Sequence, residues 1–319
     1  MLQFDGNWRF DSPGRLAIVT GGYAGLGLEA ARTLASAGAR VIVPARDAER
    51  ARNAVAEVGG AIEVQAMDLT DPASINAFAH GIVQSGLALH MLVNSAGIMA
   101  LPELARDGRG NELQFSTNHL GHFQLTVRLW PALKRAGGAR VVSVSSMGHR
   151  FSDIVWDDIN YVRRAYDPWN AYGQSKTANV LFAVELDRRG QDLGIRAFSL
   201  HPGGIITGLA KHISLARLKE MGNVDANGEP VIDPERDTKS IPQGAATHIW
   251  CAVSPQLDGK GGVFCTNSDI APLQEGEIVM SLEGRDRRTS RVAPYAVDTA
   301  SAERLWAVSE AMTEVSLPG

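Results

Sequence analysis

Length, composition and charge exclude several classes of protein. The chain has 319 residues, of which 45% are hydrophobic and 21% are charged, proportions typical of a globular protein with a sizeable core. Its formal net charge of -4 argues against a nucleic-acid partner, because such proteins carry strongly basic surfaces. The two cysteines, Cys251 and Cys265, form no disulfide framework, although a single bond between them stays open.

Targeting and membrane signals are not found in the sequence. Residues 1–15 mix charged side chains with Trp8 and lack the apolar core of a signal peptide. No stretch approaches the roughly 18 apolar residues that a membrane helix needs. Sparse cysteine usage also suits a reducing compartment. We therefore expect a cytoplasmic protein without a membrane anchor.

In chain order, short apolar runs alternate with longer amphipathic stretches. This alternation predicts βαβ units, and hence an α/β fold: a single doubly wound domain with a central parallel sheet and helices on both faces. The expected strands lie at 16–20, 40–44, 62–66, 91–94, 140–144 and 195–200, and the expected helices at 28–37, 48–58, 72–83, 118–133 and 170–189.

The alternation weakens after residue 207. Charged residues, glycine and proline dominate 208–243, which we interpret as a substrate lid or mobile segment, with a flexible surface insertion as the alternative. A helix is expected again at 244–253. Residues 272–319 form a C-terminal extension that closes with an amphipathic helix at 302–312. We treat 1–319 as one domain.

A glycine-rich turn follows the first expected strand and opens the first expected helix. Gly21, Gly25 and Gly27 punctuate it. Glycine lets backbone approach a ligand closely, and a helix N-terminus offers N–H groups and a positive dipole end to a pyrophosphate. A purely structural turn is the alternative. The spacing is not the G-x-G-x-x-G of the standard dinucleotide fingerprint.

This spacing, T-G-x-x-x-G-x-G, resembles the glycine pattern of the short-chain dehydrogenase/reductase family. Other motifs follow in the family's order along nearly the whole chain. Asn94-Ser95-Ala96-Gly97 resembles its N-N-A-G, with serine in place of the second asparagine, and Tyr172-Gly173-Gln174-Ser175-Lys176 matches its Y-x-x-x-K. His201-Pro202-Gly203, followed by Thr207, matches its P-G segment. The resemblance implies a Rossmann-type oxidoreductase.

One branch of the family is especially similar. Residues 118–123, 175–181 and 302–306 resemble the retinol-dehydrogenase-like and WW-domain-oxidoreductase-like branch. The implied reaction interconverts a small apolar alcohol and a ketone or aldehyde by hydride transfer. A dinucleotide-sensing or scaffold protein without turnover is the alternative. Homodimers and homotetramers are usual in the family.

The resemblance also implies a catalytic set of Asn118, Ser146, Tyr172 and Lys176. Tyr172 and Lys176 stand four residues apart on one helix and so share a face. A free tyrosine has a pKa of about 10, which a nearby ammonium lowers, so Tyr172 is expected to act as general acid/base. A surface Tyr–Lys pair is the alternative.

The other catalytic roles follow the family pattern. Ser146, rather than Ser145, should hold the substrate oxygen. Asn118 should organise a water that links Lys176 to solvent. Residues 147–171 are longer than in many members of the family, and they either line the substrate entrance, with Trp156, Tyr161, Tyr166 and Trp169, or form a packed surface loop.

Three histidines accompany these motifs. His119, His122 and His201 lack a carboxylate or second ligand at a useful spacing, so we interpret them as structural. No His, Cys, Asp or Glu cluster has the spacing of metal ligands, and we predict no metal site.

The end of the second expected strand decides the cofactor. An acidic residue there binds the ribose 2′-hydroxyl of NAD, whereas an arginine accommodates the 2′-phosphate of NADP. The acid would align with Ala45, and Arg46 follows it, so NADP(H) is preferred. NAD(H) stays possible because Asp47 lies close. The other cofactor contacts that the resemblance implies are Gly21, Tyr23, Gly25, Leu26, Gly27, Asp68, Leu69, Asn94, Ala96, Gly97, Tyr172, Lys176, Pro202, Gly203, Ile205 and Thr207.

Overall fold

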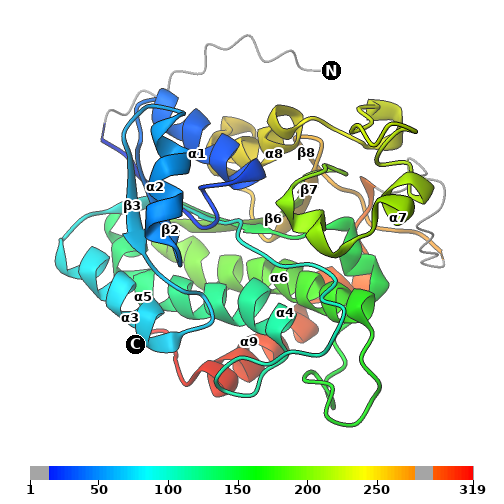
Figure 1. The fold of residues 1–319 in the computed structure, drawn as a ribbon. Coiled ribbons are helices and arrows are strands. Elements are labelled where there is room, and N and C mark those ends of the chain that lie inside the picture. Colours follow the sequence, from blue (N-terminus) through cyan, green and yellow to red (C-terminus); the bar gives the residue numbers. More distant parts are fainter. Residues whose placement is uncertain (1–13, 277–289, 319) are drawn as a thin grey trace.

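One sheet forms the centre of the computed structural model, which describes residues 14–276 and 290–318 (Figure 1). Its strand order is β3-β2-β1-β4-β5-β6-β7-β8, and every pairing is parallel except that of β7 with β8. This order confirms the expected doubly wound α/β fold. The strands are β1 (Leu16–Val19), β2 (Arg40–Ala45), β3 (Ile62–Ala66), β4 (Leu89–Asn94), β5 (Ala139–Val144), β6 (Ile195–His201), β7 (Val263–Thr266) and β8 (Asp269–Ile270).

Helices cover both faces of the sheet. On one face α1 and α8 pack together, and on the other α3, α5 and α6 form a layer, with α9 outside α6 (Figure 1). Because the central strands are covered on both sides, they consist almost entirely of buried apolar residues. The helices are α1 (Gly25–Ser36), α2 (Ala48–Ala56), α3 (Pro72–Gln84), α4 (Leu113–Phe115), α5 (Gly121–Arg135), α6 (Pro168–Gly190), α7 (Leu215–Glu220), α8 (Ile241–Val253) and α9 (Thr299–Thr313).

Capping residues set the start of two helices. Asp167 accepts a hydrogen bond from the Asn170 N–H, and Pro168 opens α6, two residues before the expected start. Ser240 and Gln243 form a capping box at α8, which therefore begins at Ile241 rather than at 244. The segment expected to be irregular up to residue 243 ends correspondingly earlier.

Two further features differ from the expected elements. A helix was expected to run unbroken from residue 118, but a π-helical turn, Ser116–Leu120, precedes α5. The short strands β7 and β8 continue the sheet beyond β6, where no strand was expected. Cys265 lies in β7 and Cys251 in α8, and both are free and buried, so the possible disulfide is not formed.

The two segments with weak sequence patterns have local structure. Residues 208–243 contain a 3₁₀ turn (Gly208–His212), α7, and isolated bridges that join Gly204 and Asp233 to Thr238. The C-terminal extension supplies a 3₁₀ turn (Pro294–Val297) and α9. Its middle, 277–289, and residues 1–13, which were expected not to form a signal peptide, lie outside the described residues. Within the described ranges, no helix is both long and apolar enough to cross a membrane.

Candidate active site

A cavity of about 1130 Å³ lies along the carboxyl ends of the parallel strands. It crosses the point between β1 and β4 where the strand order reverses, the usual ligand site of open α/β sheets. Among the predicted site residues, Asn94 and Asn118 do not line it. Those that do are Gly21, Tyr23, Gly25, Leu26, Gly27, Arg46, Asp68, Leu69, Ala96, Gly97, Ser146, Tyr172, Lys176, Pro202, Gly203, Ile205 and Thr207.

The glycine-rich turn follows the carboxyl end of β1 and forms one wall of the cavity. Gly21 and Gly25 have φ of +67° and +51°, a region that glycine occupies without strain. A Cβ at Gly27 would lie 2.4 Å from the Gly21 carbonyl oxygen, so only glycine fits this close packing. The N-cap residue of α1, Ala24, provides no side-chain cap, which leaves the first N–H groups of the helix for an acceptor from the cavity. This arrangement fits a pyrophosphate.

The far end of the same wall is basic. Arg46 lines the cavity together with Arg50, which the sequence analysis did not single out although it lies four residues further along. The Asp47 carboxylate accepts a hydrogen bond from the Arg50 N–H at 3.0 Å and so caps α2. Asp68 accepts bonds from the N–H and hydroxyl of Thr70, both at 2.8 Å.

The expected contact of Asn94 with the cofactor differs in the structure. Asn94 ends β4 and is only 1% exposed, and its amide donates to the Thr126 hydroxyl of α5 at 3.3 Å. Side chains alternate along a strand, so this position faces the α5 layer instead of the cavity. Ser95 and Ala96 carry the backbone to the cavity, and their N–H groups donate to the Thr20 hydroxyl at 2.9 and 3.0 Å.

Tyr172 and Lys176 lie on α6 and are 3% and 4% exposed, which rules out a surface pair. The Lys176 ammonium donates to the Val144 carbonyl at 3.0 Å and lies 5.6 Å from the centre of the Tyr172 ring. Burial raises the pKa of Tyr172 to about 12, against the lowering effect of a Ser146 hydrogen bond, and burial lowers the pKa of Lys176 to about 7. The expected lowering of the Tyr172 pKa was therefore wrong for this arrangement, because desolvation of the phenolate dominates.

Ser146 follows β5 and faces Tyr172. Its hydroxyl accepts a bond from the Gly148 N–H at 3.0 Å, and its interaction with the Tyr172 side chain lowers the pKa of the phenol. A Cβ at Gly148 would lie 2.6 Å from the Tyr172 ring, so glycine is required for the ring to lie this close. Ser145 instead donates to the Lys176 carbonyl oxygen at 2.7 Å, a contact that fixes β5 to α6.

Asn118 lies in the π-helical turn, and its side-chain oxygen and amide both form hydrogen bonds with other residues of the protein. Its oxygen accepts from the Ile98 N–H at 2.8 Å, while its amide donates to the Ile98 carbonyl and the Ser175 hydroxyl at 3.0 and 2.9 Å. The expected role of Asn118 in organising a water beside Lys176 stays a prediction. Asn118 joins the loop after β4 to α6. A π-helical turn at such a position is a common feature of functional sites.

The three histidines differ from one another. His119 is buried among Phe115, Phe123 and Phe182, as expected for a structural residue. Burial lowers the pKa of His122 to about 4; its two ring nitrogens contact the Thr20 hydroxyl and the Asn118 carbonyl.

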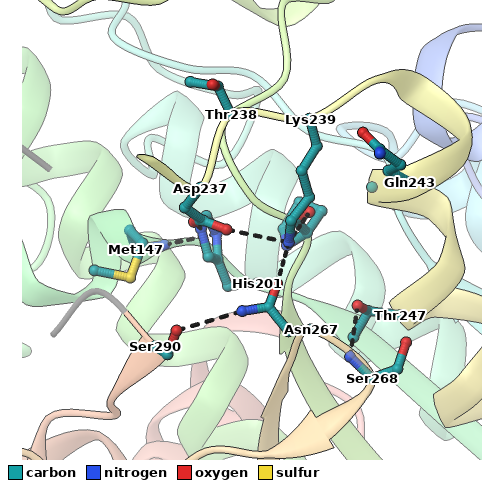
Figure 2. A network of polar contacts seen from close by, with 12 residues as sticks. Met147, His201, Asp237, Thr238, Lys239, Gln243, Thr247, Asn267, Ser268 and Ser290 are labelled. Carbon is teal, nitrogen blue, oxygen red and sulfur yellow. Dashed lines mark hydrogen bonds and ion pairs between the residues drawn. The ribbon is translucent and has the colours of Figure 1, made fainter. Parts of the chain in front are cut away.

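His201, which was interpreted as structural, has a carboxylate partner that no sequence spacing indicates. Its Nε2 lies 3.0 Å from Asp237, a partner 36 residues further along the chain (Figure 2). Both residues line the cavity.

The substrate end of the cavity has mainly apolar walls. Both expected roles of the 147–171 insertion apply in part: its ends line the cavity, whereas its middle packs against the protein. There the Arg164 guanidinium lies 3.7 Å from the centre of the buried Tyr161 ring. Met99, Met147, Phe151, Trp169, Ile206, Leu218 and Met221 form the apolar walls.

Across residues 14–276 and 290–318, no three His, Cys, Asp or Glu side chains lie together in a way that would hold a metal ion.

Comparison with known proteins identifies the family. A family model described as short chain dehydrogenase matches residues 15–217. The chain belongs to the short-chain dehydrogenase/reductase family. A protein of Streptomyces antibioticus described as "Probable oxidoreductase" is 40% identical over 301 residues, which cover 93% of this chain and 96% of that one. Human retinol dehydrogenase 12 is 35% identical over 93% of this chain and 85% of its own length. This similarity confirms the resemblance to the retinol-dehydrogenase-like branch.

A solved structure of an uncharacterised protein from Mycobacterium paratuberculosis has the same fold. It is 33% identical, has a TM-score of 0.71, and the alignment covers 97% of this chain and 98% of that one. This short-chain dehydrogenase/reductase is therefore an oxidoreductase with a Rossmann-type nucleotide-binding fold.

Proposed function

We propose that the protein is an NADP(H)-dependent oxidoreductase that interconverts a small apolar alcohol and a ketone or aldehyde, with Tyr172 as general acid/base. One observation carries the proposal: buried Tyr172 and Ser146, whose interaction with the phenol lowers its pKa, line one cavity together with the uncapped N-terminus of α1. A proton donor, an oxygen-binding hydroxyl and a phosphate site thus share one cavity.

Each catalytic residue has a role that its contacts support. Ser146 would donate a hydrogen bond to the substrate oxygen and stabilise charge that develops there. Tyr172 would exchange a proton with the same oxygen at its hydroxyl. Burial raises the pKa of Tyr172 to about 12, so the phenol is protonated at neutral pH, as carbonyl reduction requires. Lys176, whose pKa burial lowers to about 7, would add positive charge beside the Tyr172 ring when it is protonated, and Asn118 joins the loop after β4 to α6.

The cofactor site fits an NADP nucleotide. The turn from Gly21 to Gly27 would hold the pyrophosphate, and Arg46 and Arg50 the 2′-phosphate. Asp47, the residue that favoured NAD, is engaged as the cap of α2. Pro202 to Thr207 would lie beside the nicotinamide end, where the bound cofactor would supply or accept a hydride.

Replacing Tyr172 with phenylalanine tests the proposal. The variant keeps the ring but loses the proton, so we expect turnover with NADPH to fall by about 10²- to 10⁴-fold while the Kd for NADPH changes less than about twofold. Turnover is measured as loss of NADPH absorbance with a panel of apolar ketones and aldehydes. Tyr166→Phe is the matched control, because its hydroxyl donates to the Leu101 carbonyl, away from the cavity wall.

The same experiment separates the alternatives. Equal turnover in Tyr172→Phe and the native protein would remove Tyr172 from the mechanism. If the native protein bound NADPH but oxidised it with no carbonyl in the panel, the protein would be a dinucleotide sensor instead of an enzyme.

A further inference from the structure

Two histidines hold the peptide unit between Ser146 and Met147. Its carbonyl oxygen accepts a hydrogen bond from His149 Nδ1 at 2.7 Å, and its N–H donates to His201 Nδ1 at 3.1 Å. Figure 2 shows the contact from Met147 to His201. Both polar atoms of one peptide group are thus bound by imidazole rings, one of which donates and the other accepts.

The partners of the second ring nitrogens fix which tautomer each histidine adopts. His149 Nε2 accepts the Ala293 N–H at 3.1 Å, so its proton lies on Nδ1. His149 is fully buried, and burial lowers its pKa to about 3, which keeps the ring neutral. His201 must carry its proton on Nε2, because Nδ1 accepts from Met147 and Nε2 faces Asp237 at 3.0 Å.

Asp237 is held firmly in this position. Burial would raise the pKa of its carboxyl, but the hydrogen bond from His201 and the charge of Lys239 lower it well below the usual range. The Lys239 ammonium lies 3.1 Å from the carboxylate and also donates to the Pro202 carbonyl and to Asn267 (Figure 2). The backbone of Asp237 has a φ of +55° and accepts the Gly204 N–H at 2.7 Å.

These contacts link the catalytic serine to two distant parts of the chain. Asp237 belongs to the 208–243 segment, and Ala293 belongs to the C-terminal extension. The strand β5 ends at Val144, so the Ser146–Met147 peptide has no partner in the sheet. Its orientation therefore depends on the two imidazole rings and on the His149 backbone N–H, which donates to the same carbonyl oxygen at 3.1 Å, and the Ser146 hydroxyl moves with it.

We propose that His149 and His201 are positioning residues for Ser146, and that through them Asp237 and the C-terminal extension set the geometry of the catalytic centre. The proposal rests on the role of Ser146 given under the proposed function. A misplacement of a reacting group by about 1 Å can cost about 100-fold in rate, so a rotated peptide would lower turnover without loss of cofactor binding.

Three substitutions at His201 separate its two contacts. His201→Asn places an amide oxygen near the former Nδ1 and can still accept from Met147. His201→Gln reaches Asp237 but leaves the Met147 N–H without its acceptor, and His201→Leu removes both contacts. We expect kcat to fall about tenfold to 100-fold in the Leu and Gln variants and clearly less in Asn, with the Kd for NADPH within about twofold.

A matched control exists at the other end of the sheet. His90 Nδ1 accepts the Leu16 N–H at 3.2 Å, the same kind of contact outside the cavity wall. His90→Leu should leave kcat unchanged. Equal losses in His201→Asn and His201→Gln would overturn the proposed role of the Met147 contact.

A double-mutant cycle with Ser146→Ala tests whether the histidine acts through the serine. If it does, His201→Leu lowers kcat little further once Ser146 is alanine. An additional loss as large as in the native background would show that His201 acts independently of Ser146, and would overturn the proposal.

Hydrogen exchange at the Met147 amide gives a readout that needs no substrate. Exchange should be faster in His201→Leu and His201→Gln than in the native protein and in His201→Asn. This result would support the positioning contact even if no carbonyl were turned over, in which case the proposed function alone would fail. Unchanged exchange in all variants would overturn the proposal whatever the activity.

Discussion

At the scale of single residues, Arg46 provides the sharpest test of cofactor choice. It is exposed at the end of β2, on the cavity wall, beside Arg50. A guanidinium binds a phosphate through charge-assisted hydrogen bonds that are worth about 1.5–3 kcal/mol each. Arg46→Ala should therefore weaken NADPH about tenfold or more and leave NADH nearly unchanged, measured as the Kd of each nucleotide by fluorescence titration.

Arg52 supplies the control for this prediction. It lies exposed on the same helix as Arg50 but does not line the cavity, so Arg52→Ala should alter neither Kd. Parallel losses of NADPH and NADH in Arg46→Ala would show that Arg46 does not distinguish the two cofactors.

Sequence motifs located the cofactor turn, Ser146, Tyr172 and Lys176 on the cavity wall, but they could not supply pairings between distant residues. Tyr172 and Lys176 were predictable because a helix brings residues four apart onto one face. Asp237 was not, since it lies in a segment without periodicity and meets His201 only through tertiary folding. The raised pKa of Tyr172 depends on its burial depth, which no local pattern reveals.

At the scale of elements, the docking of α9 on α6 carries a stability prediction. Trp306 is 2% exposed, stacks on Phe182 at 6.0 Å and meets Phe123 edge-on at 4.9 Å. Its truncation leaves a large cavity, so Trp306→Ala should lower the free energy of unfolding by about 3–5 kcal/mol. Urea unfolding measures this change.

Val162→Ala is the control for α9, because Val162 is 75% exposed and should give less than about 0.5 kcal/mol. An equally small effect of Trp306→Ala would mean that α9 contributes little to the cooperative unit formed by the sheet and its helices.

Element boundaries followed the sequence where local chemistry determines them. The expected strand at 62–66 coincides with β3, and Asp167-Pro168 is a recognisable start of α6 in hindsight. The strands β7 and β8 were missed because they are only four and two residues long, and their position is fixed by pairing with β6 and with each other. The π-helical turn likewise follows no periodic signal that separates it from α5.

At the scale of the whole molecule, two segments that are distant in the sequence contact the site at the carboxyl ends of the strands. The 208–243 segment supplies part of the substrate wall and, through Asp237, contacts His201. The C-terminal extension contacts His149 on the other side. Segments with weak sequence patterns therefore converge on Ser146, while the strongly patterned elements carry the cofactor turn and Tyr172.

The buried histidines make the stability of the whole molecule depend on pH. Burial lowers the pKa of His119 and His149 to about 3 and of His122 and His248 to about 4, from an ordinary value of 6.5. Below pH 6.5 these histidines bind protons in the unfolded chain but stay neutral in the folded protein. Their contribution to the free energy of unfolding is therefore fully present above pH 6.5 and is lost as the pH decreases toward 4. Each such histidine contributes a slope of up to about 1.4 kcal/mol per pH unit.

The free energy of urea unfolding should therefore drop steeply between pH 7 and pH 5. Over this range Asp107 and Asp237, whose pKa values are lowered, stay ionised and add no slope. Glu112, whose pKa burial raises, acts in the opposite direction, whereas Lys176, whose pKa burial lowers to about 7, acts in the same direction as the histidines. A flat profile from pH 7 to pH 5 would mean that the buried rings accept protons inside the folded protein, since only then would folding leave their affinity for protons unaltered.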